Sequence, residues 1–461
     1  MKNRILQLLL TALFFLPFCA VKAQLPSRVS PADKVFALSH FWQEVNYNFV
    51  YLDKVDRKMW DSAYRAMITG VQATGNDYEY FRELMRFCAL LKDGHTNIYY
   101  PSYVQEKLFT SMFGDYRMML RNIGGKAIIE RTNPAGKELL PVGGEVIEMN
   151  GLPTKAYIAK YVSPYIASST DYVLEDLSIY NLLQGVEGET YAIKVKSPEG
   201  KITTAQLTHK RSTDLTLIPT PVETGLLDVR WYGDIAYVAL NSFGNRKIDT
   251  LFIEKLPELY KAKALIVDLR NNGGGSTDIG TTILEYLTND TVLEHSKYLT
   301  RQHLASFKAW GIELTPRDTV GREWNTRAYR YNHDLGTYVF DYSPGKVKKG
   351  LKTLVVPTAI LIGHNTASAA EDFVISADNQ KHMIRIGERS FGSTGQPYQF
   401  DLPGGGSARV CTKKDTYPDG REFVGYGVKP DIEVAPTVKD FIDNKDPVLE
   451  KALDHLKQKL K

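Results

Sequence analysis

Apolar residues recur every three to four positions through residues 33–92. A first series consists of Val35, Leu38, Trp42, Val45 and Phe49. A second consists of Trp60, Ala63, Met67 and Val71, and a third of Phe81, Leu84, Met85, Cys88 and Leu91. This spacing is that of helices that bury one face, and aromatic series at this spacing usually belong to a core. We therefore predict helices over 33–92, the last of which stops within residues 91–96 (LKDGHT) with Gly94 as the terminating glycine.

Between residues 110 and 212 the pattern changes to short strand-like runs. They cover residues 118–120, 126–130, 145–149, 191–195 and 204–207. Runs of this length, rich in β-branched and apolar residues and separated by Gly, Pro and Asn, indicate a β-rich domain.

Strand-like and helix-like segments alternate from residue 213 to residue 440. The predicted strands cover residues 234–240, 264–270 and 354–362, and the predicted helices cover 250–260, 277–287 and 366–377. A Tyr-rich and charged excursion over 292–350 separates the two halves of this pattern. The β-α-β order favours a largely parallel sheet that is covered by helices.

A sharp strand-to-helix corner precedes Ser368. Gly363, His364 and Asn365 form the connection, which places Ser368 in the first turn of the following helix. Free backbone N–H groups and the positive end of the helix dipole favour negative charge at that place. A hydroxyl there suits the nucleophile of an acyl transfer, and an ordinary helix-capping residue is the alternative.

A run of three glycines, Gly273 to Gly275, follows the predicted strand 264–270 and opens a helix. Phosphate binding is one interpretation of such a turn. No Gly-Lys-Ser/Thr and no Gly-x-Gly-x-x-Gly pattern accompanies it, however. The alternative is an oxyanion-binding turn, in which glycines let backbone N–H groups approach a reacting carbonyl closely.

The first 23 residues have the composition of a secretory signal peptide. Lys2 and Arg4 precede an apolar stretch over 5–18, and small residues precede Gln24. The apolar stretch is too short for a comfortable membrane span. Cys19 follows the bulky Phe18, which argues against a lipoprotein. We therefore expect export to the periplasm or cell envelope.

Charge indicates which partners are not expected, and the cysteine and histidine content bears on disulfides and metal sites. The chain has 57 Lys and Arg against 53 Asp and Glu, and three of the basic residues lie in the predicted signal peptide. The remainder is nearly neutral, so nucleic acid and anionic membranes are not expected partners. Cys88 and Cys411 form no disulfide framework and are either free or paired. No His/Cys cluster has zinc spacing, and we expect no metal or organic cofactor.

Three stretches of the sequence, followed by a fourth, occur in an order that resembles a known enzyme family. They are residues 268–275 (DLRNNGGG), 366–371 (TASAAE), 387–396 (GERSFGSTGQ) and 425–431 (GYGVKPD). The order resembles the S41 family of serine peptidases, the C-terminal processing and tricorn-core peptidases. The resemblance implies a multidomain α+β fold with an N-terminal helical segment, a PDZ-like β-rich domain and an α/β catalytic domain of the ClpP/crotonase type.

Residues 133–153 resemble part of a PDZ domain, with Gly144-Glu145 where Gly-Asp is usual. Such domains capture extended peptides as an added strand, and a β-rich spacer without a ligand is the alternative. The insertion over 155–185 leaves the shape of the groove open. The expected organisation is a signal peptide over 1–23, an N-terminal helical domain over 24–109, a PDZ-like domain over 110–212, a catalytic domain over 213–440 and a C-terminal helix over 441–461.

The resemblance also assigns residues. It implies Ser368 as nucleophile, with the backbone N–H of Ala369 and that of Gly273 or Gly274 as the oxyanion hole. Processing peptidases carry a Lys base 25 residues after the nucleophile, where this protein has Ser393. The tricorn branch uses a His at the end of the N-terminal helical segment, which corresponds to His95. Histidine suits the role because its ordinary pKa lies near neutral pH, and His364 is a weaker candidate.

The tricorn tetrad also has a Ser before the His, where this protein has Gly94, and a distant Glu that orients the base. Glu422 is the nearest candidate for that Glu, with Asp419 behind it. Asp93 is a further candidate, and a solvated loop carboxylate is the alternative interpretation of Glu422. The orienting group therefore stays open.

These observations predict an exported serine endopeptidase that hydrolyses extended or unfolded polypeptides through an acyl-enzyme, with the C-termini of these polypeptides docked on the PDZ-like domain. A catalytically inactive peptide-binding scaffold of the same fold is the alternative, motivated by the departures at Gly94 and Ser393. A serine esterase is a weaker third interpretation, because Thr366 and Ala370 stand where that class has glycines. The sequence leaves the oligomeric state open.

Overall fold

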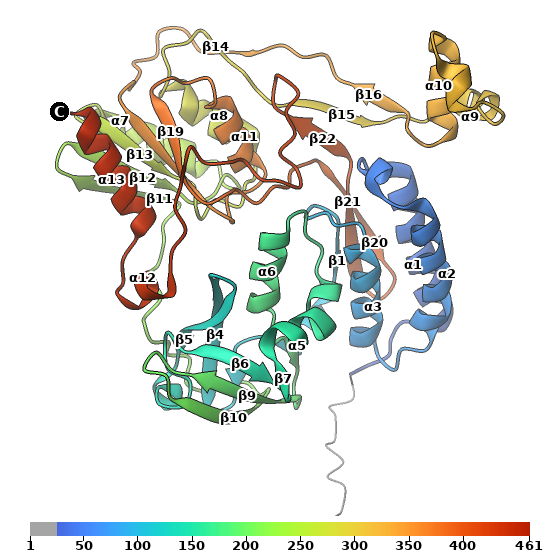
Figure 1. Cartoon of the computed structure of the whole chain (residues 1–461), viewed down its shortest axis with the longest axis horizontal. Coiled ribbons are helices and arrows are strands. Elements are labelled where there is room, and N and C mark those ends of the chain that lie inside the picture. The colour runs from blue at the N-terminus through green and yellow to red at the C-terminus, as the bar shows by residue number, and fades with distance from the viewer. Residues whose placement is uncertain (1–24) are drawn as a thin grey trace, which may run out of the picture.

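The computed structural model describes residues 25–461, so the predicted signal peptide lies outside the described residues. Figure 1 shows a group of N-terminal helices on one side, a β-rich unit below, and an α/β unit that holds the C-terminus. Within residues 25–461, no helix is long and apolar enough to cross a lipid bilayer.

The N-terminal helices are α1 (Pro31–Asn48), α2 (Arg57–Gln72) and α3 (Asp77–Ala89), which confirms the helices predicted over 33–92. The side chains of Ser30, Asp56 and Asn76 cap their N-termini by accepting backbone N–H bonds. Their apolar faces meet in an aromatic core, where the rings of Trp60 and Phe87 stack with centroids 4.0 Å apart. The short helix α4 (Ser102–Gln105) follows them.

The β-rich unit contains an antiparallel sheet in the order β10-β9-β6-β5-β4-β3, with β7 paired to β6. These strands are β3 (Met112–Phe113), β4 (Tyr116–Ile123), β5 (Lys126–Thr132), β6 (Glu145–Met149), β7 (Leu152–Pro153), β9 (Thr190–Lys196) and β10 (Ile202–Thr208). Helices α5 (Thr154–Tyr161) and α6 (Asp171–Tyr180) and the short pair β2 (Leu108–Phe109) and β8 (Gly185–Val186) complete the unit. Met118, Ile129 and Val195 are among the residues that form its separate core.

The α/β unit is built on a six-stranded sheet in the order β11-β12-β13-β18-β19-β23. The strands are β11 (Leu227–Tyr232), β12 (Ile235–Leu240), β13 (Ala264–Asp268), β18 (Thr358–Ile362), β19 (Met383–Gly387) and β23 (Ile432–Glu433). Only the β11–β12 pairing within this sheet is antiparallel. The largely parallel sheet predicted from the β-α-β order is confirmed.

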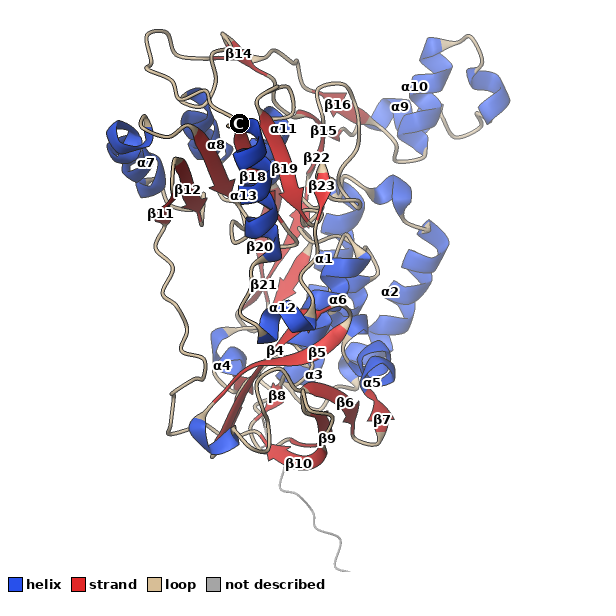
Figure 2. Cartoon of the chain, turned by 60° about the vertical axis from the view of Figure 1, so that its left-hand side comes forward, coloured by secondary structure: helices blue, strands red, loops and turns tan. Residues whose placement is uncertain are grey.

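Helices cover both faces of this sheet, as Figure 2 shows. Alternate residues of β12 separate the two sides: Val238 packs in the larger core, while Tyr237 packs beneath α13 (Pro447–Lys459). The larger core includes residues of α7 (Lys247–Leu259), α8 (Thr277–Glu285) and α11 (Ala369–Ser376). A sheet buried on both faces explains why its strands are apolar throughout.

The larger core also contains the N-terminal helices, which makes these helices and the α/β unit one packed body. A strand from each part adds to this contact, because β1 (Asn97–Tyr99) pairs antiparallel with β21 (Gly406–Cys411) beside β20 (Pro397–Leu402). The segment after α3 is therefore held against the α/β unit by backbone hydrogen bonds.

The excursion over 292–350 extends away from the sheet and ends in two short helices (Figure 1). It contains β14 (Val292–Leu293), β15 (Lys297–Arg301), α9 (Ala305–Trp310), α10 (Glu323–Asn332), β16 (Thr337–Val339) and β17 (Gly345–Lys346). Strand β15 pairs with β22 (Lys413–Thr416), which returns the excursion to the body of the unit. The short helix α12 (Val438–Ile442) lies near the C-terminus.

Candidate active site

The parallel sheet brings Ser368 and the glycine turn to the same edge. Strands β13 and β18 are paired in parallel, with Asp268 opposite Leu361, and each ends at the edge from which its loop leaves. Sites of open α/β sheets lie at this carboxyl edge. The loop after β13 holds Gly273 and Gly274, and the loop after β18 holds Ser368.

Ser368 has an unusual backbone. Its φ is 55° and its ψ is −122°, in a region that a non-glycine residue occupies only under strain. The helix predicted over 366–377 begins at Ala369, so Ser368 is its N-cap and not part of its first turn. The side chain is half-buried, and it therefore stays within reach of a substrate.

Glu371 holds this strained corner. Its carboxylate is fully buried and accepts the Ser368 N–H at 3.0 Å, the Gly392 N–H at 2.8 Å and the Ser390 hydroxyl at 2.5 Å. Burial raises the pKa of Glu371 to about 8, although these three hydrogen bonds oppose the rise. Sequence reasoning missed this role, for which the Ser-x-x-Glu spacing of a capping box was the available signal.

The glycine turn lies directly against Ser368. A Cβ on Gly274 would be 2.7 Å from Ser368 Cβ and 3.0 Å from Ala369 N, and φ of Gly274 is 94°. Only glycine fits this approach. The Gly274 N–H already donates to Asn272 Oδ1 at 3.0 Å. Within residues 25–461, the N–H groups of Gly273 and Ala369 have no hydrogen-bond acceptor.

His95 follows α3 and contacts the α/β unit through Ser393. Its Nδ1 lies 2.7 Å from Ser393 Oγ, and the residue is only 9% exposed. Burial lowers the pKa of His95 to about 4, and the nearby charges of Arg409 and Lys413 lower it further. The imidazole is therefore neutral at pH 7.

Hydrogen bonds to the β20–β21 hairpin and to α3 fix the loop that contains His95. Arg409 donates to the carbonyl oxygen of Gly94 at 3.3 Å, and the Cys411 N–H donates to Thr96 Oγ1 at 3.0 Å. Cys88 donates to the Thr96 carbonyl at 3.2 Å. Cys88 and Cys411 are both free and buried, which settles the alternative that the sequence left open.

The prediction that Gly94 terminates the last N-terminal helix is wrong. Helix α3 ends at Ala89, and the left-handed residue after it is Lys92, with φ of 50°. Gly94 is needed for another reason: a Cβ there would lie 2.7 Å from Phe391 Cε1 and 3.2 Å from Ser393 Cβ. The absent side chain lets the His95 loop approach the 391–393 loop.

A segment of the β-rich unit, residues 168–172, touches both of these loops. The Gly94 N–H donates to Ser169 Oγ at 2.9 Å. Thr170 Oγ1 donates to the Phe391 carbonyl at 3.2 Å, and the Tyr172 hydroxyl donates to the Ser390 carbonyl at 2.6 Å. All three parts of the protein thus meet around His95.

The structure separates the other predicted residues from the His95 ring. Glu422 pairs with Lys54 at 3.4 Å and also with Lys414, so its contacts are those of a surface carboxylate. Asp93 is buried and accepts hydrogen bonds from the hydroxyls of Thr96 and Ser169.

The two further candidates, Asp419 for the orienting group and His364 for the base, also form their contacts with residues other than His95 and Ser368. Asp419 pairs with Arg421 at 2.7 Å. His364, the weaker candidate for the base, has its Nδ1 2.6 Å from Asp176 Oδ2. In the described part of the chain, the one hydrogen-bond partner of the His95 ring is Ser393, and no hydrogen bond joins the ring to the Ser368 hydroxyl.

Comparison with known proteins agrees with this architecture. Residues 234–434 match the model of peptidase family S41. A carboxyl-terminal-processing protease of Picosynechococcus is 24% identical over 407 residues, which cover 88% of this chain and 84% of the relative. A second, from Synechocystis, is 23% identical over 228 residues, or 49% of this chain and 44% of the relative.

Solved structures share the fold of nearly the whole chain. The structure of mature CPAF complexed with lactacystin has a TM-score of 0.65 at 15% identity and covers 93% of this chain and 97% of that one. Mature CPAF alone has a TM-score of 0.64 at 15% identity and covers 89% and 94%. Residues 234–434, which hold most of the parallel sheet and its loops, therefore match peptidase family S41, and with processing proteases among its relatives the protein is a serine-type peptidase.

Proposed function

We propose that this peptidase is an exported endopeptidase that cleaves extended or unfolded polypeptides, with Ser368 as nucleophile and His95 as general base. The observation that carries the proposal is the strained Ser368 corner at the carboxyl edge of the sheet, against which the glycine turn packs. The N–H groups of Ala369 and Gly273 have no acceptor among the described residues. A nucleophile beside oriented N–H donors is the arrangement that acyl transfer requires.

The reaction proceeds in two halves. Ser368 Oγ attacks the carbonyl carbon of the scissile peptide bond while His95 Nε2 takes the hydroxyl proton. His95 then gives that proton to the departing amine, which leaves an ester between Ser368 and the acyl part of the substrate. A water molecule, deprotonated by the same nitrogen, hydrolyses this ester and restores the Ser368 hydroxyl.

The N–H groups of Ala369 and Gly273 stabilise the negative oxygen of the tetrahedral intermediate. Gly273 suits this role better than Gly274, whose N–H donates to Asn272 Oδ1. Donors of this kind act because they already point to the place where charge develops, so no reorganisation is needed during the reaction.

Ser393 positions the base in this mechanism. When His95 Nδ1–H donates to Ser393 Oγ, the lone pair of the ring lies on Nε2, which has no partner among the described residues. The lowered pKa of His95, about 4, keeps the ring neutral and able to accept a proton. The resemblance pointed to Glu422 for this orienting role, but its contacts with Lys54 and Lys414 do not support it.

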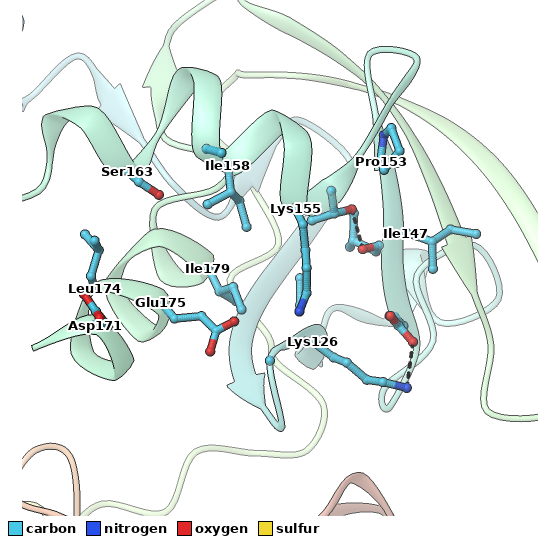
Figure 3. A pocket seen from close by; sticks show the side chains of 16 residues that line it. Lys126, Ile147, Pro153, Lys155, Ile158, Ser163, Asp171, Leu174, Glu175 and Ile179 are labelled. Atoms are coloured by element: carbon cyan, nitrogen blue, oxygen red, sulfur yellow. Dashed lines mark hydrogen bonds and ion pairs between the residues drawn. The ribbon is translucent and has the colours of Figure 1, made fainter.

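We further propose that the β-rich unit is PDZ-like and receives the C-terminal part of the substrate. A pocket of about 480 Å³ lies between its sheet and helices α5 and α6. Figure 3 shows apolar side chains such as Ile158 and Ile179 at this pocket, with Lys155 and Glu175 projecting toward the same space. Lys126 already pairs with Glu145 at 3.3 Å, which leaves Lys155 as the better cation for a terminal carboxylate.

Labelling with a fluorophosphonate tests the nucleophile. The wild-type protein should form a covalent adduct that mass spectrometry places on Ser368, and Ser368→Ala should abolish both the adduct and casein hydrolysis. The exposed Ser102→Ala serves as the matched control and should behave as wild type. Labelling that survives Ser368→Ala would refute the assignment, and a wild-type protein that neither labels nor cleaves would be a peptide-binding scaffold.

A further inference from the structure

A second cavity, of about 450 Å³, is lined in part by residues of α8 and α11, the helices that follow the glycine turn and Ser368. The residues that line it include Thr277, His295, Tyr298, Asp372, Lys413 and Asp415. They come from α8, from the excursion, from α11 and from β22. The cavity is of the size that receives one large side chain together with part of its backbone.

This cavity is tied to the catalytic elements by helix geometry. Asp372 lies one turn after Ser368, and its N–H donates to the Ser368 carbonyl at 3.1 Å. Thr277 is the first residue of α8, two residues after Gly275, and its hydroxyl donates to Asp372 Oδ2 at 2.7 Å. Lys413, which also lines the cavity, is close enough to His95 for its charge to lower the pKa of that histidine. A side chain next to the scissile bond is therefore within reach of the cavity.

The cavity wall has more negative than positive charge. Asp372 is 6% exposed and accepts hydrogen bonds only from the hydroxyls of Thr277 and Ser296, and it has no cationic partner among the described residues. Asp415 is 1% exposed, and one of its oxygens lies 2.9 Å from Lys413 Nζ. Its Oδ2 has no hydrogen-bond partner within residues 25–461.

The other ionisable groups do not cancel this excess. Burial lowers the pKa of His295, so its ring is neutral at pH 7, and its Nδ1 lies 3.1 Å from Ser376 Oγ. Lys413 is the one cation among the described residues of the wall and faces two carboxylates. Burial raises the pKa of Asp415 to about 7, with Lys413 opposing the rise and Asp372 adding to it. A second cation beside Asp415 would favour the ionised form of this buried carboxyl.

We propose that this cavity is the specificity subsite for a Lys or Arg side chain of the substrate at the position next to the scissile bond, held by Asp372 and Asp415. The inference rests on the proposed catalytic roles of Ser368 and His95. The head of the incoming side chain donates to Asp415 Oδ2 and Asp372, and its carbon stem packs on the rings of Tyr298 and Phe340 at the mouth. An acidic side chain is excluded, because it would meet two carboxylates.

Cleavage mapping gives the first test. The wild-type enzyme should cut a proteome-derived peptide mixture with Lys and Arg enriched at one position that flanks the scissile bond. A matched pair of peptides, one with Arg at that position and one with its neutral analogue citrulline, then isolates the charge. We expect kcat/KM to favour Arg by about tenfold or more, because the neutral analogue leaves buried acceptors without a charged donor.

Two variants test the residues. Asp372→Asn keeps the shape of the side chain and should lower the Arg-to-citrulline ratio to near one. Gln396→Arg adds a positive charge at an exposed position of the cavity wall and should also lower the ratio, without burying a new group. The exposed Asp454→Asn on α13 is the matched control and should leave the ratio unchanged.

The outcomes separate the two proposals. An active enzyme whose Arg-to-citrulline ratio is near one, or whose ratio does not respond to either variant, overturns the subsite while the catalytic assignment stands. A wild-type protein that cleaves no peptide and does not label on Ser368 overturns the proposed function and the subsite together. Because the readout is a ratio within one protein sample, partial loss of folding in Asp372→Asn does not mimic the expected result.

Discussion

His95 Nδ1 and Ser393 Oγ lie 2.7 Å apart, although 298 residues separate them in the sequence. Ser393 occupies the position, 25 residues after Ser368, at which the processing peptidases that the sequence resembles carry a lysine base. In this protein the same position contacts a histidine that arrives from the N-terminal helices. Position 393 is thus occupied by a residue that contacts the proposed base, while the base itself, His95, comes from the segment after the N-terminal helices.

Removal of the Ser393 hydroxyl should slow catalysis without preventing substrate binding. For Ser393→Ala we expect kcat to fall by about 10- to 100-fold with KM changed little, because the His95 ring loses the contact that orients it. Steady-state kinetics on a peptide substrate measures both constants, and thermal melting reports folding. An unchanged kcat in a folded variant would remove Ser393 from the mechanism.

A side chain at Gly94 should disturb the site. In Gly94→Ala the new methyl group would lie 2.7 Å from Phe391 Cε1, so the His95 loop or the 391–393 loop must move. We expect a loss of about 1–3 kcal/mol in the free energy of unfolding and a fall of at least about tenfold in kcat/KM. Denaturant unfolding and peptide hydrolysis give the two numbers.

Gly70→Ala is the matched control for this substitution. Gly70 lies within α2, and nothing is within 4 Å of the place its Cβ would take. Alanine there should stabilise the protein by about 0.5–1 kcal/mol, because it favours the helix and meets no neighbour. Equal behaviour of the two variants would show that the close approach at Gly94 does not matter.

The pH dependence of kcat/KM should reflect the lowered pKa of His95. A base must be unprotonated, so the rate should stay high as the pH falls below 6.5 and should decline only near pH 4. In Arg409→Gln the loss of a nearby positive charge should move this decline to higher pH. A wild-type profile that declines near pH 6.5 would mean that the ring is not buried as the structure has it.

Glu371→Gln should weaken the Ser368 corner. Above the Glu371 pKa of about 8 the ionised side chain accepts three hydrogen bonds, whereas an amide turns an N–H₂ group toward at least one of these donors, so the two proteins are compared at pH 9. We expect a loss of about 1–3 kcal/mol in the free energy of unfolding, together with reduced fluorophosphonate labelling of Ser368. The exposed Glu450→Gln should change neither quantity, and a labelling rate that stays at the wild-type value would contradict the role given to Glu371.

The contact between His364 and Asp176 should stabilise the protein mainly at low pH. Burial disfavours the charged imidazole, but the hydrogen bond and charge of Asp176, together with Glu388, raise the pKa of His364 above its ordinary value. A raised pKa contributes stability that is present below about pH 6.5 and is lost as the pH rises through the folded-state value.

Asp176→Asn should therefore lower the free energy of unfolding more at pH 6 than at pH 9. Denaturant unfolding at the two pH values measures this difference, and the exposed Asp401→Asn, which should show none, is the control. Because α6 belongs to the β-rich unit and His364 to the Ser368 loop, an equal loss at both pH values would mean that the pair does not couple these units through charge.

Much of the fold followed from the order of apolar residues. The predicted strands 234–240 and 264–270 correspond to β12 and β13, and the predicted helix 250–260 corresponds to α7. The strands are recognised from continuous apolar runs and the helix from apolar residues spaced three to four apart, and both patterns are formed by residues close together in the sequence. The run 354–362 was predicted as one strand, but β18 begins at Thr358 because Pro357 comes directly before it.

The sequence by itself also determined which chemistry the protein offers: a serine at a strand-to-helix corner, a glycine turn after a buried strand, and a histidine after the N-terminal helices. Only the tertiary structure decided which groups meet. In the folded protein, Ser393 contacts His95, and Glu371 accepts the N–H of Ser368. Glu422 instead pairs with Lys54 and Lys414. The reason is physical: periodicity records which face of a segment is buried, whereas a contact across 298 residues depends on how separate segments pack, as in the space that Gly94 leaves for Phe391.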